Sequence, residues 1–584
     1  MFDTDRPFVL LDDARPGGSA RLFRDPERVI RADTAQAVGP ALDALAAARD
    51  AGKAVAGFLR YDAGAALVPG TPARDGDGPL LWFGVFDGAG TIDAAAALPD
   101  PAGAWIGPMV PDIDAATYRA QCEAVLELIA AGDLYQANLT FGARAAVAGD
   151  PRALYAAIRG HAAAGHGALV WTGAEWLLSF SPELFFAIGG DTISARPMKG
   201  TAARDPDSVR DAAAARALAA DPKQRAENLM ILDLMRNDLS RVAVAGSVTV
   251  PERFVVETYP SVHQMVSSVT ARLLPGTDAG DAIRALFPCG SITGAPKRRA
   301  MQAIDAIEGR ARGIYTGAIG AIDADGDARF NVAIRTLHLS DGATHATLGL
   351  GSGIVADSVP GDEWRECLTK ARFLDLPAPR FDLIETMAFD PVTGIALLER
   401  HLARMRASAQ ALGFAFDRHA TRNDLQAATF RLREPARVRL LLSRSGASAI
   451  EVTTLPPAPA GPVAVALAPL PLGTRDLRLA HKTSDRRFWP KPPPGCFETV
   501  FVTPDGHVTE GSFTSVFVDG GAQLLTPPLA QGLLPGVLRS ELIARGDAVE
   551  MPLTPADLAQ GFYIGNAVRG LIHARLVAES GSPV

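Results

Sequence analysis

The feature that most constrains this chain is a short proline-containing run about two thirds of the way along it. Residues 374–380 read LDLPAPR, and two prolines in so short a run break the pattern of strands and helices on either side. With 584 residues, the chain is also too long for a single hydrophobic core. We therefore expect two main domains, at residues 1–375 and 381–584, joined by a linker at residues 376–380.

The composition is that of a globular protein, with 48% hydrophobic and 21% charged residues. A net charge of −8 argues against a nucleic-acid-binding protein, which would usually show a basic face. The four cysteines are scattered, the N-terminus shows no signal-peptide pattern, and no apolar run is long enough to cross a bilayer. These features predict a cytoplasmic protein with neither nucleic acid nor membrane as a partner.

Hydrophobic periodicity predicts an α/β protein. An amphipathic helix is expected at residues 115–131, and a mostly helical stretch at residues 207–239. Residues 177–188 are expected to form two buried strands. Residues 331–339 are expected to form one strand, with Arg335 on one of its faces.

Lysine is scarce, because only seven of the 57 lysines and arginines are lysines. Arginine stays protonated in proteins, whereas a buried lysine can lose its proton and act as a nucleophile or base. Lys199 lies in SARPMKGTAARD, where the following glycine lets the backbone approach a ligand. Taken alone, this segment is more simply interpreted as a strand-end turn with a solvated lysine.

Two predicted helices carry carboxylates among apolar neighbours. Glu227 lies in AENLMILDLMRNDLS, and Glu363 and Glu366 lie in DEWRECLTKARFL. Mg²⁺ prefers one or two carboxylates together with water and substrate oxygens, so Glu227 and Glu366 would suit it if tertiary structure joins the helices. The simpler interpretation is a set of ion pairs, with Lys370 four residues after Glu366.

Five motifs occur in one order: GDLYQANL, RPMKGT, AENLMILDLMRNDLSRV, GSITGAPKRRAM and GSGIVADSVPGDEWRE. Together they resemble the chorismate-utilising enzyme family over roughly residues 1–375, and within it the aminodeoxychorismate synthase large component. The resemblance implies an α/β fold of packed antiparallel sheets with helices, and magnesium ligands at Glu227 and Glu366. It implies substrate contacts at Gly200, Thr201, Tyr315, Arg335, Gly351, Gly353 and Glu363.

The residue type at the position of Lys199 distinguishes two branches of that family. Anthranilate synthases usually have alanine in the PIAGT version of this turn. Aminodeoxychorismate synthases usually have lysine, thought to attack the ring before ammonia enters. Two positions depart from the family pattern: a histidine appears shifted to His263, and Gln224 replaces a common glutamate. The resemblance therefore assigns no acid–base role to either of these residues.

Three features of the second domain point to one cofactor. Lys482 in AHKTSDR is again a rare lysine, and a Schiff-base lysine cannot be replaced by arginine. Glu510 in VTEGS could hold a pyridinium nitrogen, and a helix beginning near Val537 and Leu538 would offer free amides to a phosphate. Considered singly, Lys482 and Glu510 are more simply a turn lysine and a strand-end charge.

In this order the features resemble fold-type IV enzymes over roughly residues 381–584: branched-chain and D-amino-acid aminotransferases and aminodeoxychorismate lyase. The resemblance implies two α/β subdomains and pyridoxal phosphate bound to Lys482, with Glu510 at its ring nitrogen. It implies Arg404, Val537 and Leu538 at its phosphate, and a homodimer formed through this domain. Lyases and transaminases share these residues, so the motifs do not separate the two reactions.

The two resemblances together imply a bifunctional enzyme that aminates chorismate with ammonia and then removes pyruvate to give 4-aminobenzoate for folate. No glutaminase motif is evident, so ammonia is expected from a separate glutamine amidotransferase or from solution. The alternative is an anthranilate synthase large subunit fused to an aminotransferase-like domain.

Overall fold

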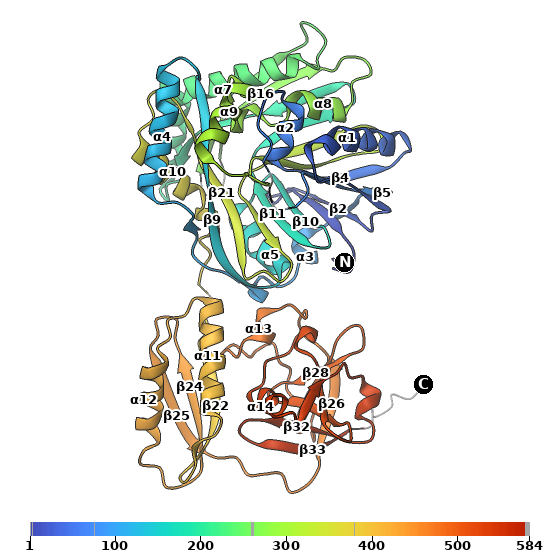
Figure 1. Ribbon diagram of the computed structural model, residues 1–584, viewed down its shortest axis with the longest axis vertical. Helices are drawn as coiled ribbons and strands as arrows, with labels where there is room; N and C mark the ends of the chain where they lie inside the picture. Colours follow the sequence, from blue (N-terminus) through green and yellow to red (C-terminus); the bar gives the residue numbers. More distant parts are fainter. Residues whose placement is uncertain are drawn as a thin grey trace. The chain divides into compact units, whose positions relative to one another are not determined.

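The computed structural model describes residues 2, 4–74, 76, 78–258, 262–378 and 380–577. They divide into two compact units (Figure 1). The first unit comprises residues 1–98, 108–146 and 155–376, and the second comprises residues 99–107, 147–154 and 377–584. Each unit is described below by itself.

The first unit contains two large sheets whose strand pairs are all antiparallel. One sheet runs in the order β17 (Gly294–Ala295), β9 (Gln136–Gly149), β21 (His345–Ile354), β20 (Thr336–Ser340), β11 (Glu175–Ser181), β10 (His166–Trp171), β1 (Phe8–Asp12), β2 (Ala20–Arg24), β6 (Gly90–Ile92). The other runs β14 (Met198–Ala203), β16 (Val262–Arg272), β13 (Thr192–Arg196), β12 (Leu184–Gly189), β19 (Ala328–Ala333), β18 (Gly317–Ile322), β4 (Ala54–Leu59), β5 (Leu81–Phe86), β3 (Arg28–Ala32), with β15 (Thr249–Thr258) paired to β16.

The core of the first unit lies on both faces of the second sheet. One hydrophobic cluster joins Val9 and Leu177 of the first sheet to Phe58 and Ile319 of the second, so the two sheets pack face to face. Another cluster covers the opposite face, where Leu42 and Leu232 bring helices onto the strands. This layering places the ends of β14 and β21 in different sheets of one sandwich.

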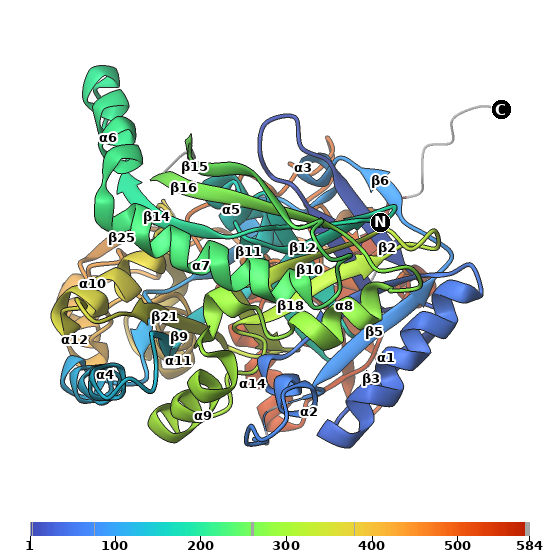
Figure 2. The same ribbon diagram turned by 90° about the horizontal axis from the view of Figure 1, so that it is seen from above.

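Helices cover the sheets of the first unit. They are α1 (Ala35–Asp50), α4 (Ala115–Ala130), α5 (Pro151–Ala162), α6 (Ser208–Ala220), α7 (Pro222–Ser240), α8 (Ala279–Leu286), α9 (Lys297–Glu308) and α10 (Pro360–Lys370). The α7 helix packs on β14 and β16 (Figure 2), and α10 packs on β21. Asp221 caps α7 by accepting hydrogen bonds from the amides of Lys223 and Gln224, and Pro222 occupies its first turn.

The prediction of one continuous strand at residues 331–339 is wrong in one respect. The strand is interrupted after Ala333, because the chain leaves one sheet there and enters the other at Thr336. Arg335 lies in this crossing with a φ of 50°, a left-handed conformation that is uncommon outside glycine. It is therefore not on a strand face.

The second unit contains two sheets, each with its own helices. The smaller runs β23 (Gly394–Ile395), β22 (Leu383–Asp390), β24 (Ala436–Leu442), β25 (Ser448–Thr454), with α11 (Leu398–Leu412) and α12 (Arg418–Thr429). The larger runs β28 (Val508–Gly511), β27 (Glu498–Val502), β26 (Val463–Pro469), β33 (Gly570–Leu576), β32 (Phe562–Asn566), β29 (Ser515–Asp519), β30 (Leu524–Thr526), β31 (Ala548–Glu550), with α13 (Leu477–Ala480) and α14 (Val537–Arg545). The expected α/β class and predominantly antiparallel sheets are confirmed.

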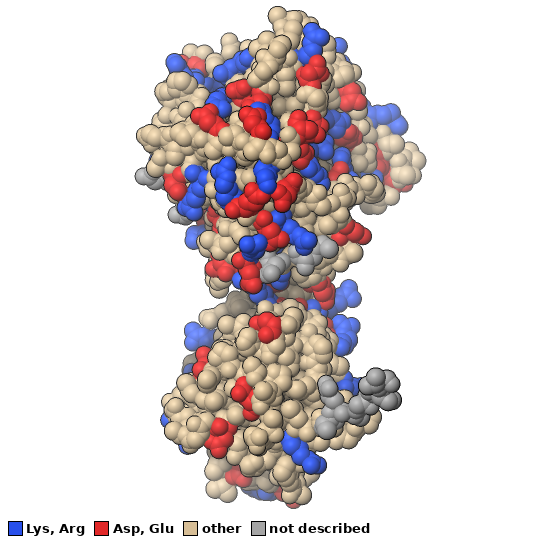
Figure 3. All heavy atoms as spheres, turned by 90° about the vertical axis from the view of Figure 1, so that its right-hand side faces the viewer, with Lys and Arg blue, Asp and Glu red and all other residues tan. Residues whose placement is uncertain are grey.

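On the face shown in Figure 3, charged side chains of both signs are interspersed over the first unit, whereas most of the second unit carries neither basic nor acidic side chains. In the described part of the chain, no helix is both long and apolar enough to cross a membrane.

Candidate active sites

Lys199 lies inside strand β14 rather than in a strand-end turn. The pairing of β14 with β16 shifts register between Met198 and Thr201, and Gly200 has a φ of 92°. Glycine adopts this conformation without strain, so the strand can bulge next to the lysine. The side chain of Thr201 lies outside the described part of the structure.

The Lys199 side chain is half-buried, and its ammonium group lies beside β21 of the other sheet. A Cβ added to Gly353 of β21 would lie 3.3 Å from Lys199 Nζ and 3.2 Å from Gln136 Nε2. Gln136 is 2% exposed, and among the described residues its Nε2 has no hydrogen-bond partner. The missing side chain at Gly353 therefore keeps a space open beside two polar groups. Burial lowers the pKa of Lys199, and the Lys370 ammonium lowers it further.

Three carboxylates from α7 and α10 act on one another near this lysine. Burial raises the pKa of Glu227. Lys199 opposes this rise, while Glu366 and Glu363 add to it. Burial also acts to raise the pKa of Glu366, but the ion pair with Lys370, at 2.7 Å, holds it below its ordinary value. Tertiary structure thus brings the two expected magnesium ligands into one electrostatic neighbourhood.

These carboxylates fit a hard cation, for which they would supply a small number of oxygen ligands. Repulsion between Glu227 and Glu366 is the kind of interaction that a divalent cation relieves. Among the described residues, no group of three or more His, Cys, Asp or Glu side chains is arranged to hold a metal. A magnesium ion here would therefore depend on these two carboxylates, water and substrate oxygens.

Glu183 is a candidate site residue that the sequence interpretation missed. It is 6% exposed and accepts a hydrogen bond of 2.7 Å from Ser291 Oγ. Burial raises its pKa, while the Lys199 and Lys370 ammonium groups act to lower it. A lone acid within the apolar run LLSFSPELFFAI was the available signal, because glutamate is rarely buried without a partner.

The other residues expected to contact the substrate have different surroundings in the structure. Gly351 of β21 pairs with Thr140, and its carbonyl accepts a hydrogen bond of 3.0 Å from Lys370 Nζ. Tyr315 is buried against Gly349, and burial raises the pKa of its hydroxyl. Glu363 accepts a hydrogen bond of 2.7 Å from Ser358 Oγ.

Both ring nitrogens of His263 lie within hydrogen-bond distance of neighbouring side chains. Its Nε2 lies 2.9 Å from Asp211 Oδ1 and its Nδ1 lies 2.9 Å from Thr258 Oγ1. Gln224 packs close to Gly200, since a Cβ there would lie 3.1 Å from its Oε1.

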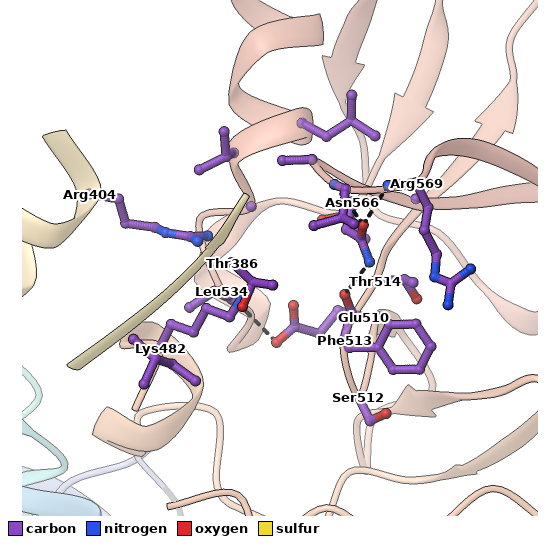
Figure 4. A pocket seen from close by; sticks show the side chains of 18 of the residues that line it. Thr386, Arg404, Lys482, Glu510, Ser512, Phe513, Thr514, Leu534, Asn566 and Arg569 are labelled. Atoms are coloured by element: carbon purple, nitrogen blue, oxygen red, sulfur yellow. Dashed lines mark hydrogen bonds between the residues drawn. The ribbon is translucent and has the colours of Figure 1, made fainter. Parts of the chain in front are cut away.

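The second unit encloses a cavity of about 390 Å³ that Lys482 and Glu510 both line. Lys482 follows α13, and its carbonyl accepts a hydrogen bond of 2.9 Å from the Ile384 amide of β22. In Figure 4 the side chains of Lys482 and Glu510 extend into the same space from different elements. Burial and the Arg404 guanidinium lower the pKa of Lys482 to about 7.

The Glu510 carboxylate, near the end of β28, is held by a backbone amide. Its Oε1 accepts a hydrogen bond of 3.0 Å from the Leu534 amide. Burial raises the pKa of its carboxyl group to about 8, although that hydrogen bond and Arg486 act to lower it. A carboxyl group with such a pKa can share a proton with a ring nitrogen at neutral pH.

Arg404 on α11 is anchored by a buried carboxylate. Its Nε and Nη2 donate to Glu385 of β22 at 2.8 and 2.6 Å, and its Nη1 donates to the Pro535 carbonyl at 3.1 Å. Although burial opposes it, Arg404 together with His401 lowers the pKa of Glu385 to about 2. Arg404 is thereby fixed beside the start of α14.

The α14 helix begins as the sequence predicted. Gly536 is its N-cap, Val537 is its first residue, and both line the cavity together with Leu538. Free amides and a nearby guanidinium suit a phosphate, and a lysine with a lowered pKa suits an aldehyde. The residues present therefore fit pyridoxal phosphate.

The comparisons with known proteins address both units. Residues 6–375 match the family model described as chorismate binding enzyme. The chain belongs to this family. Residues 382–494 and 493–577 match the model described as amino-transferase class IV, which implies a pyridoxal phosphate site. Both resemblances expected from the motifs are confirmed.

Individual relatives of this chorismate-binding chain match only part of it. Aminodeoxychorismate synthase component 1 of Escherichia coli strain K12 is 44% identical over 253 residues, 43% of this chain and 55% of that protein. Anthranilate synthase component 1 of Streptomyces coelicolor is 41% identical over 254 residues, 42% of this chain and 48% of that protein. The chain thus spans about half the length of these relatives.

Solved structures also resemble the family fold. The crystal structure of anthranilate synthase component I from Streptococcus pneumoniae aligns with a TM-score of 0.54 and 25% identity. The alignment covers 63% of this chain and 92% of that one.

Proposed function

We propose that this chain makes 4-aminobenzoate in two steps, aminating chorismate at C4 in the first unit and removing pyruvate in the second. The observation that carries the proposal is one half-buried lysine in each unit, Lys199 and Lys482, each with a pKa lowered by burial. The names of the relatives support the first step, and the class IV match supports the second. Residues 1–375 and 381–584 are proposed as the corresponding domains.

In the first step, the Lys199 amine forms a bond to the ring while the C4–O bond breaks. Burial raises the pKa of Glu183, and this carboxyl group is the proposed donor of the proton with which the hydroxyl departs as water. Ammonia then forms the C4–N bond and the lysine is expelled. Glu227 and Glu366 would hold Mg²⁺, which supplies a positive charge for the ring carboxylate.

In the second step, pyridoxal phosphate supplies an electron sink for the carbon that bears the new amine. Arg404 and the start of α14 would hold its phosphate, and Glu510 its ring nitrogen. Lys482 takes the proton from C4 and returns one to the departing enolpyruvyl group, which leaves as pyruvate. Loss of that proton together with cleavage of the ring C–O bond to the enolpyruvyl group makes the ring aromatic, and aromatisation drives the elimination.

The ammonia source follows from the same comparison. Since several matched relatives, that of Escherichia coli among them, are named as component 1, we propose that a separate glutamine amidotransferase delivers ammonia to the first unit.

A second function is favoured by one observation, the similarity to anthranilate synthase component 1. That enzyme eliminates pyruvate in the chorismate site itself and gives an ortho-aminated ring. Lys199 stands where anthranilate synthases usually have alanine, which favours the first function.

The Lys482→Ala variant tests both functions. Given chorismate, ammonia and Mg²⁺, it should accumulate aminodeoxychorismate and release pyruvate only after a competent lyase is added. The alternative function predicts pyruvate and an ortho-aminated ring from the same variant. Products are separated by mass and retention time, with Lys491→Ala in the same unit as the control. Unchanged 4-aminobenzoate release by Lys482→Ala would refute the role of this lysine.

A further inference from the structure

Asn228 is a fully buried polar residue in the middle of helix α7. It directly follows Glu227, and the helix packs on β14 and β16. Asparagine is a poor helix former, and a buried carboxamide is costly unless its polar atoms find hydrogen-bond partners. The partners of this side chain join α7 to the strand that carries Lys199.

The NH2 group of Asn228 points to the bulge in β14. Lys199 and Gly200 of β14 together face a single residue of β16, Met265, where the register shifts. Such a bulge leaves backbone groups without their usual partners in the sheet. Asn228 Nδ2 donates to the carbonyl oxygens of Lys199 and Met265 at 3.4 and 3.5 Å, and one NH2 group has a hydrogen for each. The carboxamide thus bridges the two strands at the bulge.

The oxygen of the same carboxamide is held by Ser267 of β16. Ser267 Oγ donates to Asn228 Oδ1 at 2.5 Å and accepts from the Phe254 amide at 3.1 Å. Phe254 lies in β15 within a second register shift, with a φ of 59°. Turning the carboxamide over would bring its oxygen against the two carbonyl oxygens of the β14 bulge, so Ser267 fixes the orientation of Asn228.

This network joins two parts of the proposed amination site, because Lys199 extends from the bulge and Glu227 precedes Asn228 on α7. Without the carboxamide, two buried carbonyl groups would lose a partner, and the bulge could shift relative to the helix. A displacement of a reacting group by about 1 Å can lower a rate about a hundredfold. The position of this backbone segment therefore matters to the chemistry of the lysine.

We propose that Asn228 is a positioning residue for the amination of chorismate, because its carboxamide fixes the backbone of the β14 bulge from which Lys199 reaches the ring. The inference rests on the proposed role of Lys199 in the first step. Asn228 acts through the Lys199 carbonyl and does not itself contact the reacting atoms. Ser267 orients the carboxamide and so contributes indirectly.

The first test is kinetic and uses excess ammonia and Mg²⁺. Asn228→Leu keeps a side chain of similar size but removes the donor and the acceptor. Its kcat for chorismate amination should fall about a hundredfold, while KM for chorismate should rise by less than about tenfold, because most of the expected substrate contacts lie outside β14. Asn237→Leu, at an exposed position on the same helix, is the matched control and should leave both constants unchanged.

Ser267→Ala is a second, milder variant that leaves Asn228 in place. It removes only the hydroxyl that orients the carboxamide, so kcat should fall about tenfold. A protein with both changes, Asn228→Leu and Ser267→Ala, should be no slower than Asn228→Leu alone, because both act through one carboxamide. Unchanged kcat in both single variants, or losses that multiply in the double variant, would overturn the proposal. If Asn228→Leu does not fold, the kcat of Ser267→Ala decides.

Amide hydrogen exchange tests the same network without any reaction. In a peptide spanning residues 198–203, Asn228→Leu should exchange about tenfold faster than the wild type, because a bulge that loses hydrogen bonds opens more often. Asn237→Leu should match the wild type. If the wild-type protein does not aminate chorismate while exchange differs in this way, the proposed first step fails and the positioning network stands. Equal exchange in Asn228→Leu and the wild type would overturn the inference.

Discussion

At the scale of single residues, partial burial is the physical basis of the chemistry proposed for Lys199 and Lys482. Burial disfavours the charged form, so each amine is neutral at a lower pH than an ordinary lysine. The sequence could identify both residues, because lysine is scarce and each lies in a recognisable motif. It could not show that Glu183 and Gln136 lie near Lys199, because their positions depend on contacts between two sheets.

Lys199→Arg separates a nucleophile from a positive charge that only binds substrate. Arginine keeps the charge but cannot form the bond to the ring, so aminodeoxychorismate formation should fall by several orders of magnitude. Product is measured with excess ammonia and Mg²⁺, and Lys53→Arg, at a surface ion pair with Glu27 and Asp87, is the control. Retention of most of the activity by Lys199→Arg would rule out the covalent role.

Glu510→Gln should change how the stability of the cofactor-free protein depends on pH. The carboxyl pKa is raised from 4.5 to about 8, so between these values the folded protein keeps a proton that the unfolded chain has released. Stability therefore falls as pH rises through this window, by about 1.4 kcal/mol per pH unit for one proton. The Glu510→Gln side chain has no carboxyl group to titrate, so this variant lacks that pH-dependent loss of stability. Thermal unfolding at about pH 5 and pH 8 should show a smaller decrease for Glu510→Gln than for the wild type, and equal decreases would contradict the assignment.

At the scale of elements, helices with clear caps and amphipathic faces were predictable. The helix expected at residues 115–131 is α4, and the stretch at 207–239 is α6 and α7 with a break at Asp221. The bulge in β14 and the crossing at Arg335 were not predictable. Both are departures from strand geometry that tertiary pairing imposes on residues with strand-like sequence.

The α7 and α10 helices carry the expected magnesium ligands, so a change on either helix should affect only the first step. Glu227→Gln or Glu366→Gln should abolish chorismate consumption, because the single remaining carboxylate would bind a hydrated divalent ion too weakly. Both variants should still release pyruvate from supplied aminodeoxychorismate. Asp362→Asn, elsewhere on α10, is the control, and full turnover by Glu366→Gln in a chelator would exclude this metal site.

At the scale of the whole molecule, the two sites lie in separate compact units, so their reactions should be separable. A mixture of Lys199→Arg and Lys482→Ala proteins should form 4-aminobenzoate although neither protein does so alone. Aminodeoxychorismate made by one protein would diffuse to the other. Product is followed over time and should appear after a lag that shortens as protein concentration rises. No product, with each remaining half-reaction intact, would contradict free release of the intermediate.

The scarcity of lysine has a consequence for chemical labelling. Electrophiles that acylate amines react with the neutral form, and burial makes Lys199 and Lys482 richer in that form than an ordinary lysine at the same pH. Lys53, Lys297 and Lys370 are held in ion pairs, and the remaining positive charges are almost all arginines, which such reagents leave alone. A small anionic acylating reagent should therefore react faster with Lys199 and Lys482 than with an exposed lysine such as Lys491.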